Sequence, residues 1–119
     1  MKNQLFRAIQ PQEQRVISSL LVEPFPGRDE IFEQMATAMA KTIDENGSLE
    51  FLINSLTKLN HVKYVVPVEG EYEDRDGGTV HVLLHVSGDK IHELEFFRED
   101  GARVLSWPVT ALLRVFVPQ

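Results

Sequence analysis

Apolar and polar residues alternate in three consecutive runs between positions 64 and 98 of the chain. Alternation with a period of two is typical of a strand that buries one face. The runs are separated by residues 74–78 and 87–90, which are rich in aspartate, serine and glycine, the residues that tight turns favour. The pattern therefore predicts an antiparallel meander of three strands joined by two hairpins.

The register of the first hairpin determines which side chains share a face, because a slip of one residue turns every side chain over. Closing this hairpin around Asp76 places Tyr72 opposite Val80 and Glu71 opposite His81. The apolar residues of both strands then lie together on the face that we expect to be buried. The glutamates and histidines lie together on the other face.

The second hairpin can close around Gly88 in two ways. A three-residue loop places Val82 opposite Leu94 and His81 opposite Glu95. A two-residue loop would place Val82 opposite Glu95 and bring carboxylates into the core, so the three-residue loop is our prediction. The polar face is then predicted to carry Glu69, Glu71, Glu73, His81, Leu83, His85, Glu93, Glu95 and Phe97.

Two helices are predicted before the meander. The first begins at Pro11, because proline suits a first helical turn, and it ends before Pro24. Its apolar residues recur at helical spacing. The second covers residues 29–46, from Asp29 as the N-cap to an Asn-Gly pair as the C-terminal stop. Its apolar stripe consists of Ile31, Met35, Ala38, Met39 and Thr42, widened by Phe32 and Ile43.

Three shorter segments complete the predicted fold. Residues 48–54 form a strand, residues 55–60 a connection that could be helical, and residues 109–117 either a final strand or a short helix. The predicted fold class is α+β, with two N-terminal helices packed on an antiparallel sheet of four or five strands that has the three-strand meander at its centre. No long linker interrupts the chain, so residues 1–119 are predicted to form a single domain.

Composition narrows the classes of function. The net charge of -6 argues against a nucleic-acid partner, which needs clustered lysine and arginine, and it suits a basic protein partner. The absence of cysteine excludes disulfides and zinc–thiolate sites. No run approaches the roughly 20 apolar residues of a membrane span, and the N-terminus lacks the apolar run of a secretory signal. We therefore expect a cytoplasmic protein without membrane contact.

The candidate ligand-binding residues are Glu71, His81 and Glu95, predicted to lie in one cross-strand row, with His85 further along the same strand as His81. A histidine between carboxylates can act as a general base or help to bind a metal such as zinc or manganese. The same residue types are also common on an ordinary solvated face. No nucleophile or oxyanion donor is identifiable beside them, so the sequence assigns no catalytic residue and no cofactor.

Residues 74–78 are similar to part of a calcium-binding loop, but the twelfth position of that loop, which should be glutamate, is His85. Aspartate and glycine are also the residues of tight turns, so a turn is the preferred interpretation. The sequence contains no Walker loop, dinucleotide fingerprint, nucleophile elbow or His-Glu-x-x-His zinc motif.

Several short pieces of the chain resemble a group of small bacterial proteins that share a domain of unknown function. The matching pieces are residues 7–9, 47–51, 72–77 and 93–98, together with Pro108. The chain departs from the group at Glu95, where aspartate is expected, and at Phe97 and Arg98, where Trp-Lys is expected. The resemblance implies a helical N-terminal half on a small antiparallel sheet. It implies no activity and therefore assigns no catalytic residue.

The predicted function is that of a small acidic binding protein without enzymatic activity, such as an inhibitor or immunity-type partner of a basic toxin or nuclease. Leu83, Phe97 and Trp107 are the candidate contact residues, although burial against the helices is the preferred interpretation of Trp107. The alternative is a metal-dependent hydrolase or a small-ligand-binding protein that uses the histidines and glutamates of the polar face. If residues 109–117 form an edge strand, its unpaired backbone groups favour a homodimer.

Overall fold

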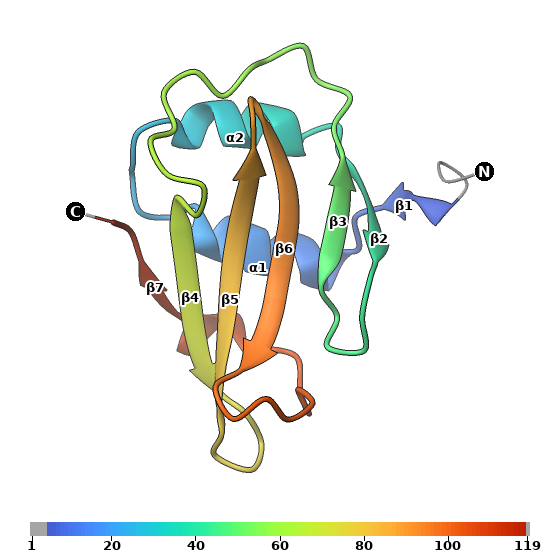
Figure 1. Cartoon of the computed structure of the whole chain (residues 1–119), viewed down its shortest axis with the longest axis vertical. Coiled ribbons are helices and arrows are strands. Elements are labelled where there is room, and N and C mark those ends of the chain that lie inside the picture. Colours follow the sequence, from blue (N-terminus) through green and yellow to red (C-terminus); the bar gives the residue numbers. More distant parts are fainter. Residues whose placement is uncertain (1–4, 119) are drawn as a thin grey trace.

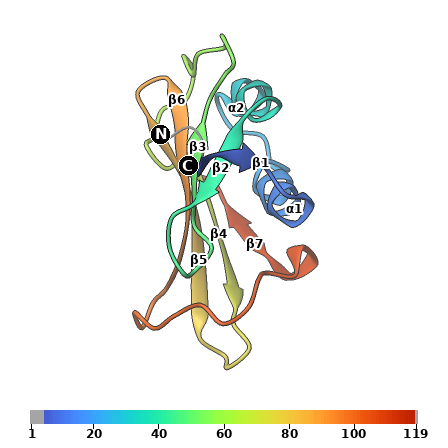
Figure 2. The ribbon, with the colours of Figure 1, turned by 90° about the vertical axis from the view of Figure 1, so that its right-hand side faces the viewer.

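The computed structural model describes residues 5–118, in which two helices pack on one face of a seven-stranded antiparallel sheet (Figures 1 and 2). The strand order is β1-β2-β3-β6-β5-β4-β7. The predicted α+β class is confirmed, whereas the predicted number of four or five strands is wrong. The elements are β1 (Arg7–Ala8), α1 (Pro11–Leu20), α2 (Arg28–Met35), β2 (Met39–Thr42), β3 (Leu49–Leu52), β4 (Val68–Glu73), β5 (Thr79–Ser87), β6 (Lys90–Arg98), the 3-10 helix η2 (Thr110–Leu112) and β7 (Arg114–Phe116).

The strands that exceed the predicted number are β1 and β2, at one edge of the sheet. Strand β2 lies in the segment predicted to continue the second helix to residue 46, but α2 ends at Met35. The short apolar stretch around Ala40 fits both the helical and the alternating pattern. Ala40 is fully buried opposite Phe51 of β3, so pairing with β3 makes this stretch a strand. Gly47, with a φ of 91°, lies in the β2–β3 hairpin and does not end a helix.

Helix α2 is held over the sheet by the buried side chain of Gln34. Its amide nitrogen donates hydrogen bonds to the carbonyl oxygens of Thr57 and Asp89, at 2.7 and 2.9 Å. Its amide oxygen accepts a hydrogen bond from the Ile91 N–H at 3.0 Å. The connection over residues 55–60 is therefore fixed by Gln34 and is not helical. The N-cap of α2 is Gly27, so the prediction of Asp29 as the cap is wrong.

The first hairpin of the meander has the predicted register, with Tyr72 opposite Val80 and Glu71 opposite His81. The predicted turn follows β4. Gly77 adopts a φ of 88°, and its N–H donates to the carbonyl oxygen of Asp74 at 2.9 Å. Glycine adopts this left-handed conformation without steric cost, which explains its place in the turn.

The second hairpin differs from the predicted register by two residues, because His81 lies opposite Phe97 and not opposite Glu95. The turn has the two-residue loop that was rejected on sequence grounds. A β-bulge directly after His85 supplies the extra residue that returns the apolar side chains of β5 and β6 to the core. The same residues therefore face the core as predicted, but the pairs on the polar face are different.

One buried arginine connects the first hairpin to the C-terminal part of the chain. The guanidinium group of Arg98 donates to Asp76 at 2.8 Å and to Asp100 at 2.7 Å. It also donates, at 3.2 Å, to Asp74, whose side chain is fully buried. Asp74 accepts a further hydrogen bond from the Ser106 hydroxyl at 2.6 Å. We call these five residues the Arg98 network. Because the aspartates of residues 74–78 bind Arg98, the structure supports a turn there and not a calcium loop.

The C-terminal segment contains both of the elements predicted as alternatives for residues 109–117. The 3-10 helix η2 comes first, and β7 follows and pairs with β4 at the edge of the sheet. Within residues 5–118, neither helix has the length and apolar character that crossing a lipid bilayer requires.

The Arg98 network shifts the pKa values of its carboxyl groups. Burial by itself would raise the pKa of Asp74, but the hydrogen bonds that its carboxylate accepts outweigh burial and lower the pKa to about 2. A hydrogen bond from Arg98 lowers the pKa of Asp100. Hydrogen bonds from the Gly78 N–H and then from Arg98 lower the pKa of Asp76. All three groups are therefore more acidic in the folded state than in the unfolded state.

This difference determines how stability depends on pH. A carboxyl group whose pKa is depressed by folding stabilises the protein above its unfolded pKa, and this contribution is lost as the pH falls towards the folded pKa. We therefore expect the free energy of unfolding, measured in urea, to fall between about pH 4 and pH 2. We expect Asp74→Asn to be less stable at pH 5 and to lose less stability over that range.

The matched control is Glu45→Gln, which removes an exposed carboxylate that makes no hydrogen bond or ion pair with a described residue. This variant should keep the pH profile of the native chain. An Asp74→Asn profile parallel to the native profile would show that Asp74 does not carry the effect.

Candidate functional site on the open face of the sheet

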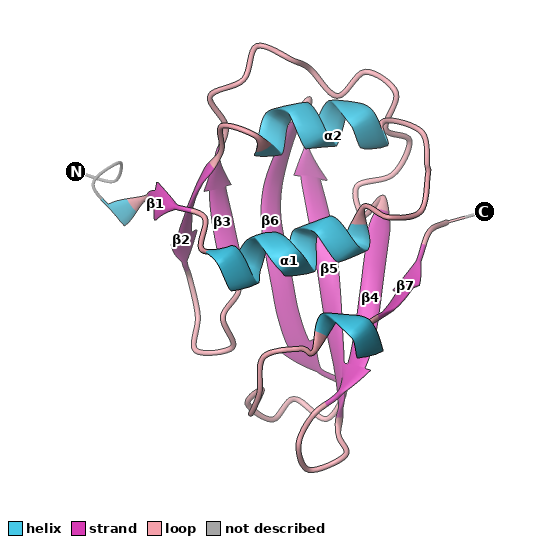
Figure 3. Cartoon of the chain, turned by 180° about the vertical axis from the view of Figure 1, so that it is seen from behind, coloured by secondary structure: helices cyan, strands magenta, loops and turns pink. Residues whose placement is uncertain are grey.

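The two helices cover only one face of the sheet, as the side view and the view from behind show (Figures 2 and 3). We call the opposite side the open face. It includes every residue predicted for the polar face of the meander, and neighbouring strands extend it. The open face carries Lys41, Glu50, Glu69, Glu71, Glu73, His81, Leu83, His85, Glu93, Glu95, Phe97 and Arg114.

The predicted row of Glu71, His81 and Glu95 does not form. The residue opposite His81 on β6 is Phe97, and the two rings stack with their centroids 5.2 Å apart. The Nε2 atom of His81 lies 2.7 Å from a carboxylate oxygen of Glu99. Glu71 lies opposite His81 on β4, but its carboxylate accepts a hydrogen bond from Arg114 on the other side, at 3.1 Å. Glu71 and His81 therefore each bind a residue from outside the predicted row.

His85 and Glu95 do come together. The Nε2 atom of His85 lies 2.8 Å from a carboxylate oxygen of Glu95, and both side chains are about one-third exposed. Glu93 lies directly opposite His85 and is half-buried. One nitrogen or oxygen from each of these three residues lies within 4.8 Å of the other two. The described residues thus contain one compact His/Glu cluster, next to the bulge between β5 and β6.

Sequence reasoning missed Glu93 and Glu99 as partners of the histidines. Both errors follow from the register of the second hairpin, which the two-residue loop and the bulge beside His85 together shift by two residues. Bulges are often marked by glycine, but the extra residue here is His92, between Ile91 and Glu93 of β6, so the sequence carries no signal for the bulge. The composition of the open face could be predicted, whereas its contacts could not.

The candidate contact residues lie in two different places. Leu83 and Phe97 are half-buried on the open face, where Leu83 lies opposite both Glu69 and Glu95. Trp107 belongs to the covered side, since its ring packs against Phe96 of the core with centroids 4.9 Å apart. Packing therefore explains Trp107, and the open face has two of the three candidate contact residues.

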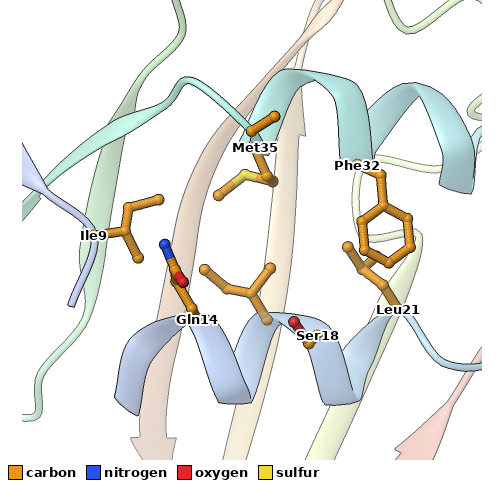
Figure 4. A pocket seen from close by; sticks show the side chains of 8 residues that line it. Ile9, Gln14, Ser18, Leu21, Phe32 and Met35 are labelled. Carbon is orange, nitrogen blue, oxygen red and sulfur yellow. The ribbon is translucent and has the colours of Figure 1, made fainter. Parts of the chain in front are cut away.

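A pocket of about 250 Å³ lies between the two helices on the covered side (Figure 4). The side chains of Phe32 and Met35 from α2 face those of Gln14, Ser18 and Leu21 at α1. Its lining contains no acid, base or nucleophile with a shifted pKa. Its lining is mostly apolar, so this pocket is a weaker candidate for a functional site than the open face.

A second pocket, of about 400 Å³, lies between β4 and the C-terminal segment. Its lining includes Tyr72, Arg75 and Arg114. Burial and then the nearby Asp74 raise the pKa of Tyr72, so its hydroxyl stays protonated and donates to the carbonyl oxygen of Ser106 at 2.8 Å. Arg75 donates to the protein backbone and Arg114 to a carboxylate. The hydroxyl of Tyr72 and the guanidinium groups of Arg75 and Arg114 are thus already engaged within the chain.

Comparison with known proteins gives a family and no activity. A family model described as Domain of unknown function (DUF6984) matches residues 6–108, which include the Arg98 network and the open face up to β6. No curated protein and no solved structure matches the chain. The evidence on function is therefore the surface of the protein itself.

Proposed function

The chain belongs to the family of the domain of unknown function DUF6984, and we propose that it is a binding protein whose open face takes a basic protein partner. The observation that supports this function is the arrangement of the open face. Carboxylates surround the half-buried Leu83 and Phe97. An apolar centre with a charged rim is the usual anatomy of a protein–protein interface.

The charge of the open face selects the kind of partner. Glutamates occupy most of its positions, and the cationic side chains are Lys41 and Arg114. Both of these cations already face a glutamate, with Lys41 at 3.8 Å from Glu50 and Arg114 at 3.1 Å from Glu71. A negative face of this kind favours encounter with a positive surface and disfavours nucleic acid. We infer a cytoplasmic bacterial role as an inhibitor or immunity-type partner of a basic protein.

Affinity capture tests this function most directly, with the native chain compared with Leu83→Arg. Placing a cation at the apolar centre of the face should abolish capture of a basic partner, because it adds a like charge and removes apolar contact. The complex formed by the native chain should weaken as salt is raised from 0.05 to about 0.5 M. Partners are identified by mass spectrometry, and thermal unfolding verifies that the variant is folded.

The matched control is Val22→Arg, which makes the same substitution at a residue that is 67% exposed, just after α1. This variant should capture the same partner as the native chain. Capture that survives Leu83→Arg, or that is lost equally in Val22→Arg, would remove the open face from the interaction.

Self-association through β7 is a separate proposal about the same chain. Strand β7 is an edge strand, so one side of its backbone is not paired within the sheet. Phe116 of β7 is 45% exposed, and Val109 and Leu112, which precede the strand, are 63% and 68% exposed. An unpaired edge next to exposed apolar side chains favours pairing with a second copy of the chain.

Light scattering at micromolar concentration should therefore give twice the mass of one chain. Leu112→Glu should shift the equilibrium to the monomer, because it places negative charges of two copies close together. A single-chain mass for the native protein at every concentration would refute the dimer.

A further inference from the structure

We propose that His85, Glu93 and Glu95 form a binding site for one divalent transition-metal ion on the open face. This site differs from the set of Glu71, His81, His85 and Glu95 that the sequence suggested, because the bulge at His92 of β6 brings Glu93 opposite His85. The inference does not depend on a protein partner, and it names a ligand class that the proposed binding function leaves open.

The donor atoms are already close to the separation that a metal ion requires. Two ligands bound tetrahedrally at about 2.1 Å lie about 3.4 Å apart. The Nε2 atom of His85 and an oxygen of Glu95 are 2.8 Å apart, and one oxygen of Glu93 completes a group whose members lie within 4.8 Å of one another. Shifts of about one ångström, within the reach of rotations of glutamate side chains, would therefore bring all three to an ion.

Electrostatics around Glu93 favour a cation at this position. Glu93 lies between Glu50, directly opposite on β3, and the Glu95 side chain on its own strand. Like charges placed opposite each other in a sheet repel. Lys41 on β2 faces Glu50 at 3.8 Å, and the Glu93 carboxylate makes no hydrogen bond or ion pair with any residue between 5 and 118. A bound dication would supply the charge that this half-buried carboxylate lacks.

The same strand provides an internal comparison. His81 also lies on the open face and also has a glutamate oxygen, from Glu99, at 2.7 Å from its Nε2. The residue opposite His81 is Phe97, where the residue opposite His85 is Glu93. Glu71, opposite His81 on β4, is already bound to Arg114, so the carboxylate left for His81 is that of Glu99. Among residues 5–118, the group of three donors that a mononuclear site needs forms at His85.

The ligand set identifies the class of metal. One imidazole and two carboxylates suit zinc or manganese better than calcium, which takes oxygen ligands alone, or copper(I), which prefers sulfur. Three protein ligands leave further positions for water or for a group of a partner. The site is therefore of the open type that binds an exchangeable ion, and it is not a closed structural site.

The test titrates the native chain, stripped with chelator and desalted, with zinc chloride and separately with manganese chloride in a calorimeter. We expect one ion per chain for at least one of the two metals, with a rise in thermal unfolding temperature, because the ion binds the folded state. Glu93→Gln keeps the shape of the side chain and should weaken binding at least about tenfold, since even outer-sphere partners of metal ligands are worth that much. His85→Ala should do the same.

The matched control is His81→Ala, which removes the histidine of the site with only one carboxylate and should leave affinity and stoichiometry unchanged. Thermal unfolding in the presence of chelator checks that each variant is folded. If His85→Ala does not fold, the comparison of Glu93→Gln with the native chain decides the result. No binding of either metal by the native chain would overturn the proposal. Equal losses in His81→Ala and Glu93→Gln would also overturn it, because they would show binding to exposed side chains in general.

Discussion

The ion pairs of the buried Arg98 guanidinium are the interaction on which the rest of the structure depends. They join the turn after β4, the end of β6 and the segment that leads to η2 and β7. A buried arginine is tolerated only when its donors meet acceptors, and here three aspartates supply them. Residues 72–77 and 93–98, two of the pieces that carry the family resemblance, therefore meet in space. Their role is to hold this end of the sheet together.

This arrangement separates the covered side, which holds the fold together, from the open face. The helices and the Arg98 network lie on the covered side and at the end of the sheet, where burial and hydrogen bonds stabilise the chain. On the open face, Glu50 and Glu93 are two glutamates that lie directly opposite each other. Such a pair does not stabilise the fold, since the two negative charges repel each other. A bound cation or a basic partner would neutralise these charges and so explain why both glutamates are present.

The sequence predicted the fold where one pattern dominated. The proline start of α1 and the alternation around the Asp74 turn were sufficient for the first helix and the first hairpin. Strand β2 was missed because apolar residues at helical and at alternating spacing coincide around Ala40, and only pairing with β3 decides between them. The residues of β6 that lie opposite His81 and His85 were predicted wrongly because of the bulge. The bulge is needed to bury the apolar residues of both strands when the loop has two residues, and no single residue marks it.

We infer that the open face is maintained for binding at a cost in stability. The free energy of unfolding of Glu93→Gln, measured in urea with chelator and without a partner, tests it most directly. We expect the variant to be more stable than the native chain by up to about 1 kcal/mol, because it removes a like-charge pair. Glu73→Gln, on the same face but opposite Thr79, should change little. A loss of stability in Glu93→Gln would contradict the claim, because it would show that this carboxylate stabilises the fold.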